Sequence, residues 1–261
     1  MITTVVGCTA ACCLVMLLVW IWAYRIQNAG VVDIFWAFNF SIIAIILLLT
    51  GRGLPARILM VSSIVFIWSM RLGIYLLIRV GSHLSQEEGR YKKLREEWAP
   101  NANLKFFFFF QMQALSNVYL AIPFFLACFN PAPEMNMLEY IGAAVWAISL
   151  VGEGIADAQL KNFKSNPENK GKVCNAGLWN YSRHPNYFFE SMIWVGYFIT
   201  AVTAPYGWLA ILAPATILFL VLRLTGIPMT EEQAIRSKGD AYREYQRTTS
   251  AFIPWFKKSG L

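Results

Sequence analysis

The sequence predicts an all-α membrane protein with seven transmembrane helices, and three observations lead to that fold class. Hydrophobic residues make up 57% of the 261 residues and charged residues only 14%, which is too apolar for a soluble domain of this length. The apolar runs are about 20 residues long, the length that a helix needs to cross a bilayer. They also lack the alternation expected of barrel strands. We therefore expect a polytopic bundle of helices.

Seven apolar segments, taken in order along the chain, form the predicted spans. They cover residues 2–24, 31–50, 58–80, 106–129, 137–159, 187–203 and 207–224. The second, fourth and sixth spans are followed by short connections, and "NPAPEMN" (130–136) is typical of a turn-rich link. The other spans from the third onward are followed by longer polar segments. In the first of these, "SQEEGRYKKLREEWAP" (85–100) mixes charges and ends in proline, which predicts a short surface helix.

Lysine and arginine orient this bundle, because they accumulate in loops that stay in the cytoplasm. With the N-terminus outside and the C-terminus in the cytoplasm, all of the 22 basic residues except Arg52, Arg57 and Arg71 lie on the inner side. The net charge of +7 then follows from topology and from attraction to anionic membrane lipids. We expect no nucleic-acid partner, and no obligate protein partner is evident.

Polar residues inside the spans are predicted to lie in the inner half of the membrane. Those that carry the argument are Asp33, Arg71, Tyr75, Gln111, Gln113, Glu153, Asp157, Asn186 and Glu190. Several are four residues apart, the spacing that stacks two side chains on one helix face. Ionisable groups at this depth are costly and usually face the bundle interior or a wet cavity. We therefore expect a shared polar pocket open to the cytosol; the alternative is a set of interhelical ion pairs.

Basic residues crowd the predicted mouth of this pocket. They are Lys161, Lys164, Lys170, Lys172 and Arg183. Such residues can pair with phosphates, so a nucleotide cofactor fits the pocket, although a role as topology signals is equally well supported. No GxGxxG or Walker loop is present. The cysteines form no CxxC and the two histidines lack a set of partners, so we expect neither a metal site nor a hydrolytic triad.

A specific combination of motifs covers nearly the whole chain. The central one is "GLWNYSRHPNYFFE" (177–190), with "EGIADAQLKNFKSNPENKGK" before it and "EEQAIRSKGDAYREYQRTTSAFIPWF" near the end; "VVDIFW", "RLGIYLLIR" and "GRYKKLREEW" lie upstream. Together they resemble the steroid 5-alpha-reductase family, in particular its bacterial members. Sterol reductases and isoprenylcysteine carboxyl methyltransferases carry similar RHP stretches. One departure is Phe189, where relatives usually have glycine, and its ring could narrow the pocket.

The resemblance implies a single membrane-embedded reductase domain, residues 1–261. Residues 1–105 would form the substrate side and residues 106–261 the cofactor side. The enzyme would hold NADPH in a cavity facing the cytoplasm of a bacterial inner membrane. Its substrate would be a 3-oxo-4-ene steroid or a similar lipid enone that enters from the bilayer.

Cofactor-binding roles carry over from the family by position in the spans. Asn186 and Glu190 would hold the nicotinamide carboxamide. Arg71 and Tyr75 would contact the cofactor from the third span. Asp157 would reach the adenosine.

Further roles fall on basic residues and on the C-terminal segment. Lys164 is the candidate for the 2′-phosphate, with Lys172 or Arg183 assisting. Tyr242 or Tyr245, together with Glu231, would close over the site. His184, directly before Pro185, is expected to precede a helix that begins with proline.

The implied reaction adds a hydride to the β carbon of an enone. Negative charge then develops on the carbonyl oxygen and must meet a hydrogen-bond donor that is already in place. In the family this role belongs to a carboxylic acid on the second span and a tyrosine on the third. Here the acid is Asp33, expected to stay protonated because it is buried. Trp68 occupies the tyrosine position, and an indole does not readily release a proton.

Two other functions are compatible with parts of the sequence. One is an S-adenosylmethionine-dependent membrane methyltransferase of the isoprenylcysteine type, which shares the RHP stretch, an acidic pair (here Glu231 and Glu232) and an aromatic tail with Ile-Pro. The other is a channel or carrier. Broken spans in two matching halves, typical of carriers, are absent from the sequence, which argues against that function.

Overall fold

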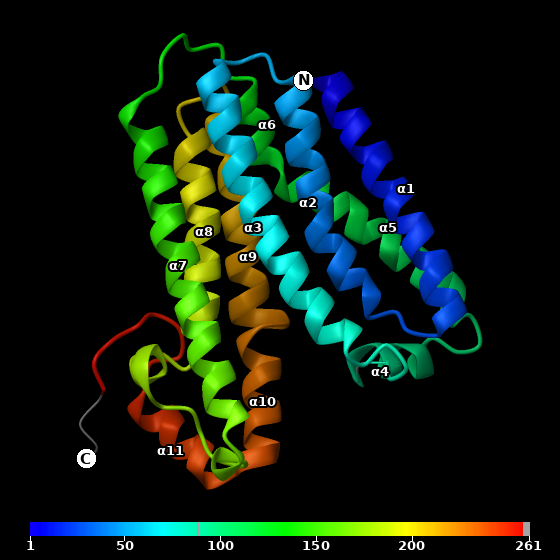
Figure 1. Cartoon of the computed structure of the whole chain (residues 1–261), viewed down its shortest axis with the longest axis vertical. Helices are drawn as coiled ribbons and strands as arrows, with labels where there is room; N and C mark the ends of the chain where they lie inside the picture. The colour runs from blue at the N-terminus through cyan, green and yellow to red at the C-terminus, as the bar shows by residue number, and fades with distance from the viewer. Residues whose placement is uncertain (88, 258–261) are drawn as a thin grey trace. The chain divides into compact units, whose positions relative to one another are not determined.

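The residues that the structure describes are mainly helical. A computed structural model describes residues 1–87 and 89–257, and its ribbon is drawn in Figure 1. Within these residues there is no strand, and the β-type pairing consists of an isolated parallel bridge between Ser182 and Ser250. The prediction of an all-α fold is confirmed.

Several of the described helices are long and apolar enough to cross a membrane. Over the described ranges, five helices are long and apolar enough to cross a bilayer, or six if the bent pair α5 and α6 forms one span. The predicted span 187–203 corresponds to α8 (Pro185–Ala201), which has 17 residues and stands at the short end of the usual range of about 17–25. The chain therefore has the helices of an integral membrane protein. The total of seven spans and the outside N-terminus stay predictions.

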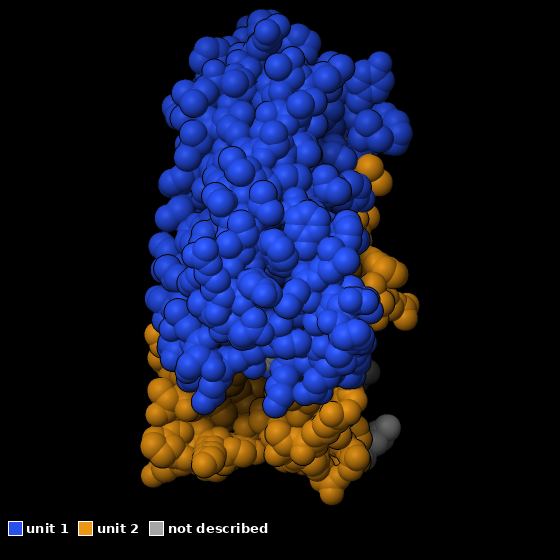
Figure 2. Space-filling model, turned by 90° about the vertical axis from the view of Figure 1, so that its right-hand side faces the viewer, with its two compact units in different colours: residues 1–136, 201–209 blue, residues 137–200, 210–261 orange. Residues whose placement is uncertain are grey.

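Two compact units make up the chain, and Figure 2 colours them separately. Unit 1 comprises residues 1–136 and 201–209, and unit 2 comprises residues 137–200 and 210–261. The predicted boundary between a substrate side and a cofactor side, at residues 105 and 106, falls inside unit 1. The single reductase domain and its two functional sides stay predictions.

Unit 1 is built on the first six helices. They are α1 (Ile2–Ile26), α2 (Val31–Thr50), α3 (Pro55–Gly81), α4 (Gly89–Glu97), α5 (Ala102–Leu120) and α6 (Ile122–Cys128). α1 packs on α2 and α5, while α3 packs on α2 and α6 (Figure 1). The predicted surface helix is α4. The predicted span 106–129 is bent by 41° between α5 and α6, because Pro123 lacks an N–H and its ring clashes with the preceding turn.

Small residues bring α2 and α3 close together. A Cβ atom on Gly73 would come within 2.4 Å of the Phe38 ring, which occupies the space that the glycine leaves. The Ser69 hydroxyl donates to the Ala37 carbonyl oxygen at 2.6 Å and lies 2.7 Å from the Ser41 hydroxyl. These buried hydroxyls satisfy one another inside the apolar pair of helices.

The remaining elements follow in chain order. They are α7 (Met137–Ser165), η1 (Pro167–Asn169), η2 (Gly177–Asn180), α8 (Pro185–Ala201), η3 (Gly207–Ile211), α9 (Leu212–Phe219), η4 (Leu220–Leu224), α10 (Ile227–Lys238) and α11 (Asp240–Thr248). α7 and α8 cross closely, since a Cβ on Gly142 would lie 2.4 Å from the Thr200 hydroxyl oxygen and one on Gly196 would lie 2.9 Å from the Gly142 carbonyl oxygen. This contact places the last turns of α8 against the first turns of α7.

Candidate functional site

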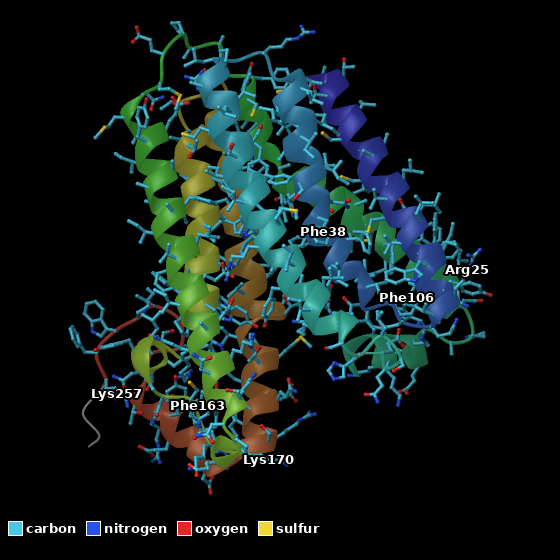
Figure 3. All side chains as sticks on the ribbon, in the orientation of Figure 1. Arg25, Phe38, Phe106, Phe163, Lys170 and Lys257 are labelled. Carbon is cyan, nitrogen blue, oxygen red and sulfur yellow. The ribbon has the colours of Figure 1, made fainter. Side chains whose placement is uncertain are left out.

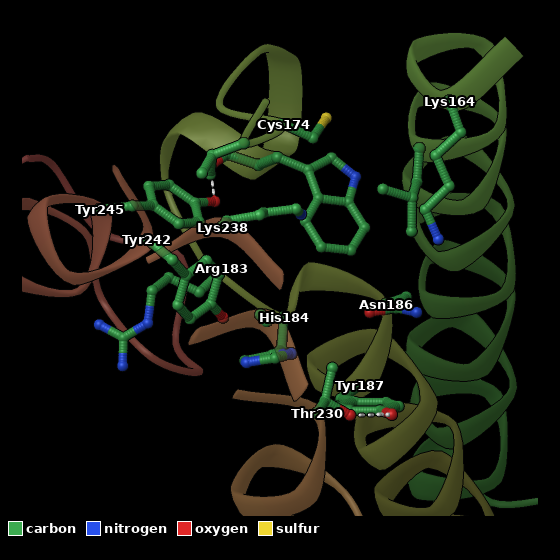
Figure 4. Close-up of a pocket in the computed structure, with 14 residues that line it drawn as sticks. Lys164, Cys174, Arg183, His184, Asn186, Tyr187, Thr230, Lys238, Tyr242 and Tyr245 are labelled. Carbon is green, nitrogen blue, oxygen red and sulfur yellow. Dashed lines mark hydrogen bonds between the residues drawn. The ribbon is translucent and has the colours of Figure 1, made fainter. Parts of the chain in front are cut away.

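Five of the predicted cofactor-binding residues line one cavity of about 190 Å³ within unit 2 (Figure 4). They are Lys164, Arg183, Asn186, Tyr242 and Tyr245. The end of α7, the loop before α8, the first turn of α8 and α11 supply them. Residues that are up to 81 positions apart in sequence thus surround one space. Lys172 lines an adjoining cavity of about 370 Å³, which Lys164 lines as well.

The RHPN stretch forms the entry to α8. Pro185 is the first residue of the helix, as the sequence predicts, because the missing N–H of proline has no helical partner at this position. The His184 carbonyl oxygen accepts the first helical bond, from Phe188 N at 3.1 Å. Arg183 therefore stays in the loop, while Asn186 sits in the first turn of the helix.

Arg183 ties α10 and α11 to the start of α8. Its Nε lies 2.6 Å from Glu231 Oε1, and its Nη1 donates to the carbonyl oxygens of Gln246 (2.8 Å) and Thr249 (2.7 Å). Glu231 also lies 3.2 Å from His184 Nε2 and accepts from Gln246 Nε2 at 2.8 Å. Charge-assisted bonds of this kind are strong because both groups are largely removed from water. The role of Arg183 beside a phosphate stays a prediction.

Tyr245 fastens α11 to the loop before α8. Its phenol donates to the carbonyl oxygens of Trp179 and, at 3.2 Å, Ser182. The Tyr242 phenol donates to Glu231 Oε1 at 3.5 Å. Burial raises the pKa of both phenols, so both stay protonated at neutral pH and act as donors. α11 is thereby held as one wall of the cavity.

Asn186 presents a hydrogen-bond acceptor that the protein does not use. Its Nδ2 lies 3.4 Å from Asp157 Oδ1. Its Oδ1 is buried and accepts no hydrogen bond within the described part of the chain. A buried carbonyl oxygen without a donor is destabilising, so an amide N–H of a ligand would satisfy it. Glu190, one turn further along α8, accepts from Trp194 Nε1 at 2.9 Å and is not part of the cavity lining.

Phe189 packs away from this cavity. A Cβ atom on Gly152 of α7 would lie 2.5 Å from the Phe189 ring, so the ring occupies the space beside that glycine. Phe189 is not among the residues that line the cavity. Where relatives have glycine on α8, this chain has Phe189, and Gly152 of α7 leaves room for the Phe189 ring. The ring therefore does not narrow the cavity.

The other predicted residues belong to unit 1. Asp33, in the first turn of α2, accepts a hydrogen bond of 2.6 Å from the Tyr91 phenol. Trp68 is fully buried, and its ring meets Phe40 edge-on with 5.2 Å between the centroids. Arg71 and Tyr75 lie one turn apart on α3, with Tyr75 half exposed. Their roles with the cofactor stay predictions.

Two residues of potential function were not identified from the sequence. Tyr91 contacts Asp33, and Lys238 lines both cavities of unit 2. Tyr91 carries a usable signal, since it is the aromatic residue in the charged segment "GRYKKLREE" and such a residue tends to face inward. Lys238 carries none, because a basic residue at the end of a helix is common for reasons of the helix dipole alone.

A protein-family model matches most of the chain, whereas the individual known proteins match it over a short stretch or at low identity. The family described as "Protein of unknown function (DUF1295)" matches residues 19–249. A probable O-methyltransferase, ustE, of Ustilaginoidea virens is 46% identical over 46 residues, which cover 18% of this chain and 16% of that protein. The uncharacterized protein C594.04c of Schizosaccharomyces pombe is 23% identical over 258 residues, which cover 87% of this chain and 73% of that protein. No solved structure matches the chain significantly.

Proposed function

The chain belongs to the DUF1295 family, and from that premise we propose that it is a membrane-bound, NADPH-dependent reductase. The proposed reaction reduces the conjugated carbon–carbon double bond of a lipid enone, such as a 3-oxo-4-ene steroid. The motifs that resemble steroid 5-alpha-reductases support the reaction class. The observation that carries the proposal is the convergence of Lys164, Asn186 and the two tyrosines of α11 around one cavity.

The donor and acceptor set of this cavity fits a nicotinamide nucleotide. The unused Oδ1 of Asn186 matches the N–H of a carboxamide, with Glu190 proposed as a second partner one turn away. Lys164 and Lys172 match phosphates. The larger of the two adjoining cavities has about 370 Å³, which lies within the common range of about 300–1,000 Å³ for ligand sites. Arg71, Tyr75 and Asp157 are proposed to complete the binding of the nucleotide.

The polarising group is proposed to be Asp33. When bound, the cofactor would supply a hydride to the β carbon of the substrate, and a proton would have to follow to the α carbon to complete the reduction. The developing charge on the carbonyl oxygen requires a donor that is already oriented. The hydrogen bond from Tyr91 fixes the direction of the Asp33 carboxyl group and places a phenol beside it. We therefore propose Tyr91, in place of the buried Trp68, as the partner of Asp33.

The proposed placement in the membrane follows from the distribution of basic residues. We propose seven spans, an outside N-terminus and a cofactor site facing the cytoplasm of a bacterial inner membrane. The 17 residues of α8 are enough for a short span. The lipid substrate would enter from the bilayer.

A second candidate function is methyl transfer from S-adenosylmethionine. The match to a probable O-methyltransferase favours it, although that match covers 18% of this chain. S-adenosylmethionine carries no phosphate, so it would leave the lysines of the two cavities without a ligand group of matching charge. This difference supports the reductase over the methyltransferase.

Turnover tests the proposed function directly. Purified full-length protein in lipid nanodiscs is supplied with NADPH and with a panel of 3-oxo-4-ene steroids, and NADPH oxidation is followed together with the reduced product. We expect oxidation that depends on the enone and that is lost in Asp33→Ala. Methylation of a lipid or thiol acceptor, with no enone-dependent oxidation of NADPH by any member of the panel, would overturn the proposal.

A further inference from the structure

The second cavity of unit 2 adjoins the first. It lies between the end of α7, the loop 165–172 and the end of α10. Leu160, Lys164, Cys174 and Lys238 line both cavities. The two cavities therefore meet at these four side chains, and Lys164 and Lys238 face both.

Four lysines line the second cavity, without an acidic residue among the lining side chains. They are Lys164, Lys170, Lys172 and Lys238, and Figure 3 shows Lys170 in the loop beyond α7. Glu168, the acid of the same loop, is exposed and does not belong to the lining. Over residues 1–87 and 89–257, none of these lysines forms an ion pair with a carboxylate. Among the described residues, therefore, no carboxylate neutralises their charge.

The loop that carries two of these lysines is held in shape by side-chain hydrogen bonds. Asn166 Oδ1 accepts from Glu168 N at 3.0 Å. Asn169 Nδ2 donates to the Phe163 carbonyl oxygen at 3.0 Å, which ties the loop back to the last turns of α7. These bonds order the loop backbone, so a ligand in the cavity would have to order only the side chains of its lysines.

Lys238 is the least exposed of the four lysines. It is half-buried at the end of α10, and its Nζ lies 5.9 Å from the centroid of the Tyr242 ring. Lys164 enters the same space from the α7 side (Figure 4), and the two ammonium groups repel each other. Two like charges near each other, one of them half-buried, are unfavourable without a counter-charge. An anion placed between them would relieve that repulsion.

We propose that Lys164 and Lys238 together bind a phosphate monoester, the 2′-phosphate of the nucleotide cofactor, and that Lys170 and Lys172 surround it. This inference rests on the proposed function and adds Lys238 to the residues that the resemblance implied. A phosphate monoester carries about −1.5 to −2 charges at neutral pH, which matches two ammonium groups. A phosphodiester, such as most lipid headgroups, carries one. Arg183 is not needed for this role, because Glu231 and two carbonyl oxygens already engage it.

The test uses two probes that differ in the 2′-phosphate alone, 2′,5′-ADP and 5′-AMP. Full-length protein in phosphatidylcholine nanodiscs is titrated with each by calorimetry at one ionic strength, since salt screens such contacts. The variants are Lys238→Gln and Lys164→Gln. The matched control is Lys161→Gln, which changes an exposed lysine of α7 that lines neither cavity. Circular dichroism and the thermal midpoint confirm that each variant is folded.

The wild type should bind 2′,5′-ADP more tightly than 5′-AMP by about tenfold or more. Lys238→Gln and Lys164→Gln should each remove about tenfold of affinity for 2′,5′-ADP and leave 5′-AMP unaffected, while Lys161→Gln should behave as wild type. An unchanged preference in Lys238→Gln overturns the inference. Loss of the preference when phosphatidic acid, a lipid monoester, is added to the discs would assign the lysines to a lipid headgroup and would also overturn it.

Two further outcomes separate this inference from the proposed reductase. Lys238-dependent binding of 2′,5′-ADP without NADPH-dependent reduction of any enone would support the phosphate site and remove the reductase. Enone reduction by Lys238→Gln with the wild-type ratio of NADPH to NADH activity would support the reductase and remove the phosphate site.

Discussion

The phenol of Tyr91 donates a 2.6 Å hydrogen bond to Asp33 Oδ1, joining α4 to the first turn of α2 across 58 residues of sequence. Tyr91 is 1% exposed, although it belongs to a highly charged helix. Tyr91 is thus the buried residue through which α4 docks, beside the contacts that Arg95 makes with Glu87 and Phe106. The contact between Tyr91 and Asp33 orients the carboxyl group that we propose to polarise the substrate.

Replacing Tyr91 by phenylalanine should impair the reaction more than cofactor binding. Tyr91→Phe keeps the ring but removes the hydrogen bond, so the Asp33 carboxyl group loses its fixed direction. We expect a loss of about 1–3 kcal/mol of stability and a fall of about tenfold or more in kcat, with a changed pH–rate profile. NADPH affinity should stay within about twofold. Tyr140→Phe, at a position 57% exposed, is the control. An unaltered kcat and pH profile in Tyr91→Phe would show that Tyr91 has only a structural role.

Neighbouring glutamates on α10 should differ sharply in their importance. Glu231 forms a largely buried pair with Arg183 (14% and 10% exposed), whereas Glu232 forms an exposed pair with Arg236 (63% and 77%). Glu231→Gln leaves a buried guanidinium without its counter-charge and should cost about 3–5 kcal/mol. Glu232→Gln should cost about 0–1 kcal/mol. Thermal unfolding and limited proteolysis of the C-terminal segment measure the stability of both variants. Equal effects of the two substitutions would contradict the buried pairing of Glu231 with Arg183.

Two glycines of α7 provide a second matched pair. A Cβ on Gly152 would meet the Phe189 ring at 2.5 Å, whereas a Cβ on Gly154 would have no neighbour within 4 Å. Gly152→Ala should therefore destabilise by about 1–3 kcal/mol through overpacking. Gly154→Ala should be neutral or stabilising by up to about 1 kcal/mol. Adding Phe189→Ala to Gly152→Ala should recover part of the loss in thermal stability. If Gly152→Ala proves harmless, Phe189 does not pack as described.

Stability at acidic pH should depend on Glu87, which lies between α3 and α4. It accepts two hydrogen bonds of 2.8 Å from Arg95 and one of 2.8 Å from Ala29 N. Burial alone raises the pKa of Glu87, but the bonds from Arg95 and Ala29 outweigh it and hold the pKa below its ordinary value. A carboxyl group of this kind stabilises the fold above its unfolded pKa of about 4.3, and that contribution is lost as the pH falls through the folded pKa.

The corresponding measurement compares wild type with Glu87→Gln in thermal unfolding over a pH series. At pH 7 the wild type should be the more stable of the two. The difference should shrink progressively below pH of about 4.3. A difference that stays constant down to the acid limit would show that the carboxylate is not the source of the stabilisation.

Much of the fold could be predicted because apolar length alone identifies membrane helices. The ends of the helices were harder to predict from the sequence. α7 continues to Ser165 instead of ending near residue 159, since "LKNFK" contains good helix formers after the apolar run ends. The bend between α5 and α6 carries a sequence signal in Pro123, but a proline inside an apolar run can either bend a span or end it.

The candidate site was predictable in part for a different reason. Asn186, Arg183 and Lys164 occur in motifs whose spacing and resemblance point to a binding site. Lys238 and Tyr91 matter through contacts with segments that are far away in sequence, and no local pattern encodes such contacts. The compensation between Phe189 and Gly152 is of the same kind, because the sequence marks Phe189 as a departure but gives no sign that Gly152, on another helix, leaves room for its ring.

The most direct test of the account is a thermal-stability titration of purified wild type and Asn186→Ala with NADPH, NADH and S-adenosylmethionine. A ligand that binds the folded state alone stabilises it by about 2.7 kcal/mol at a concentration of 100 times its Kd. We predict that NADPH raises the midpoint of the wild type, that NADH raises it less, and that Asn186→Ala responds weakly to both. A midpoint that responds to S-adenosylmethionine and to neither nucleotide would contradict the account.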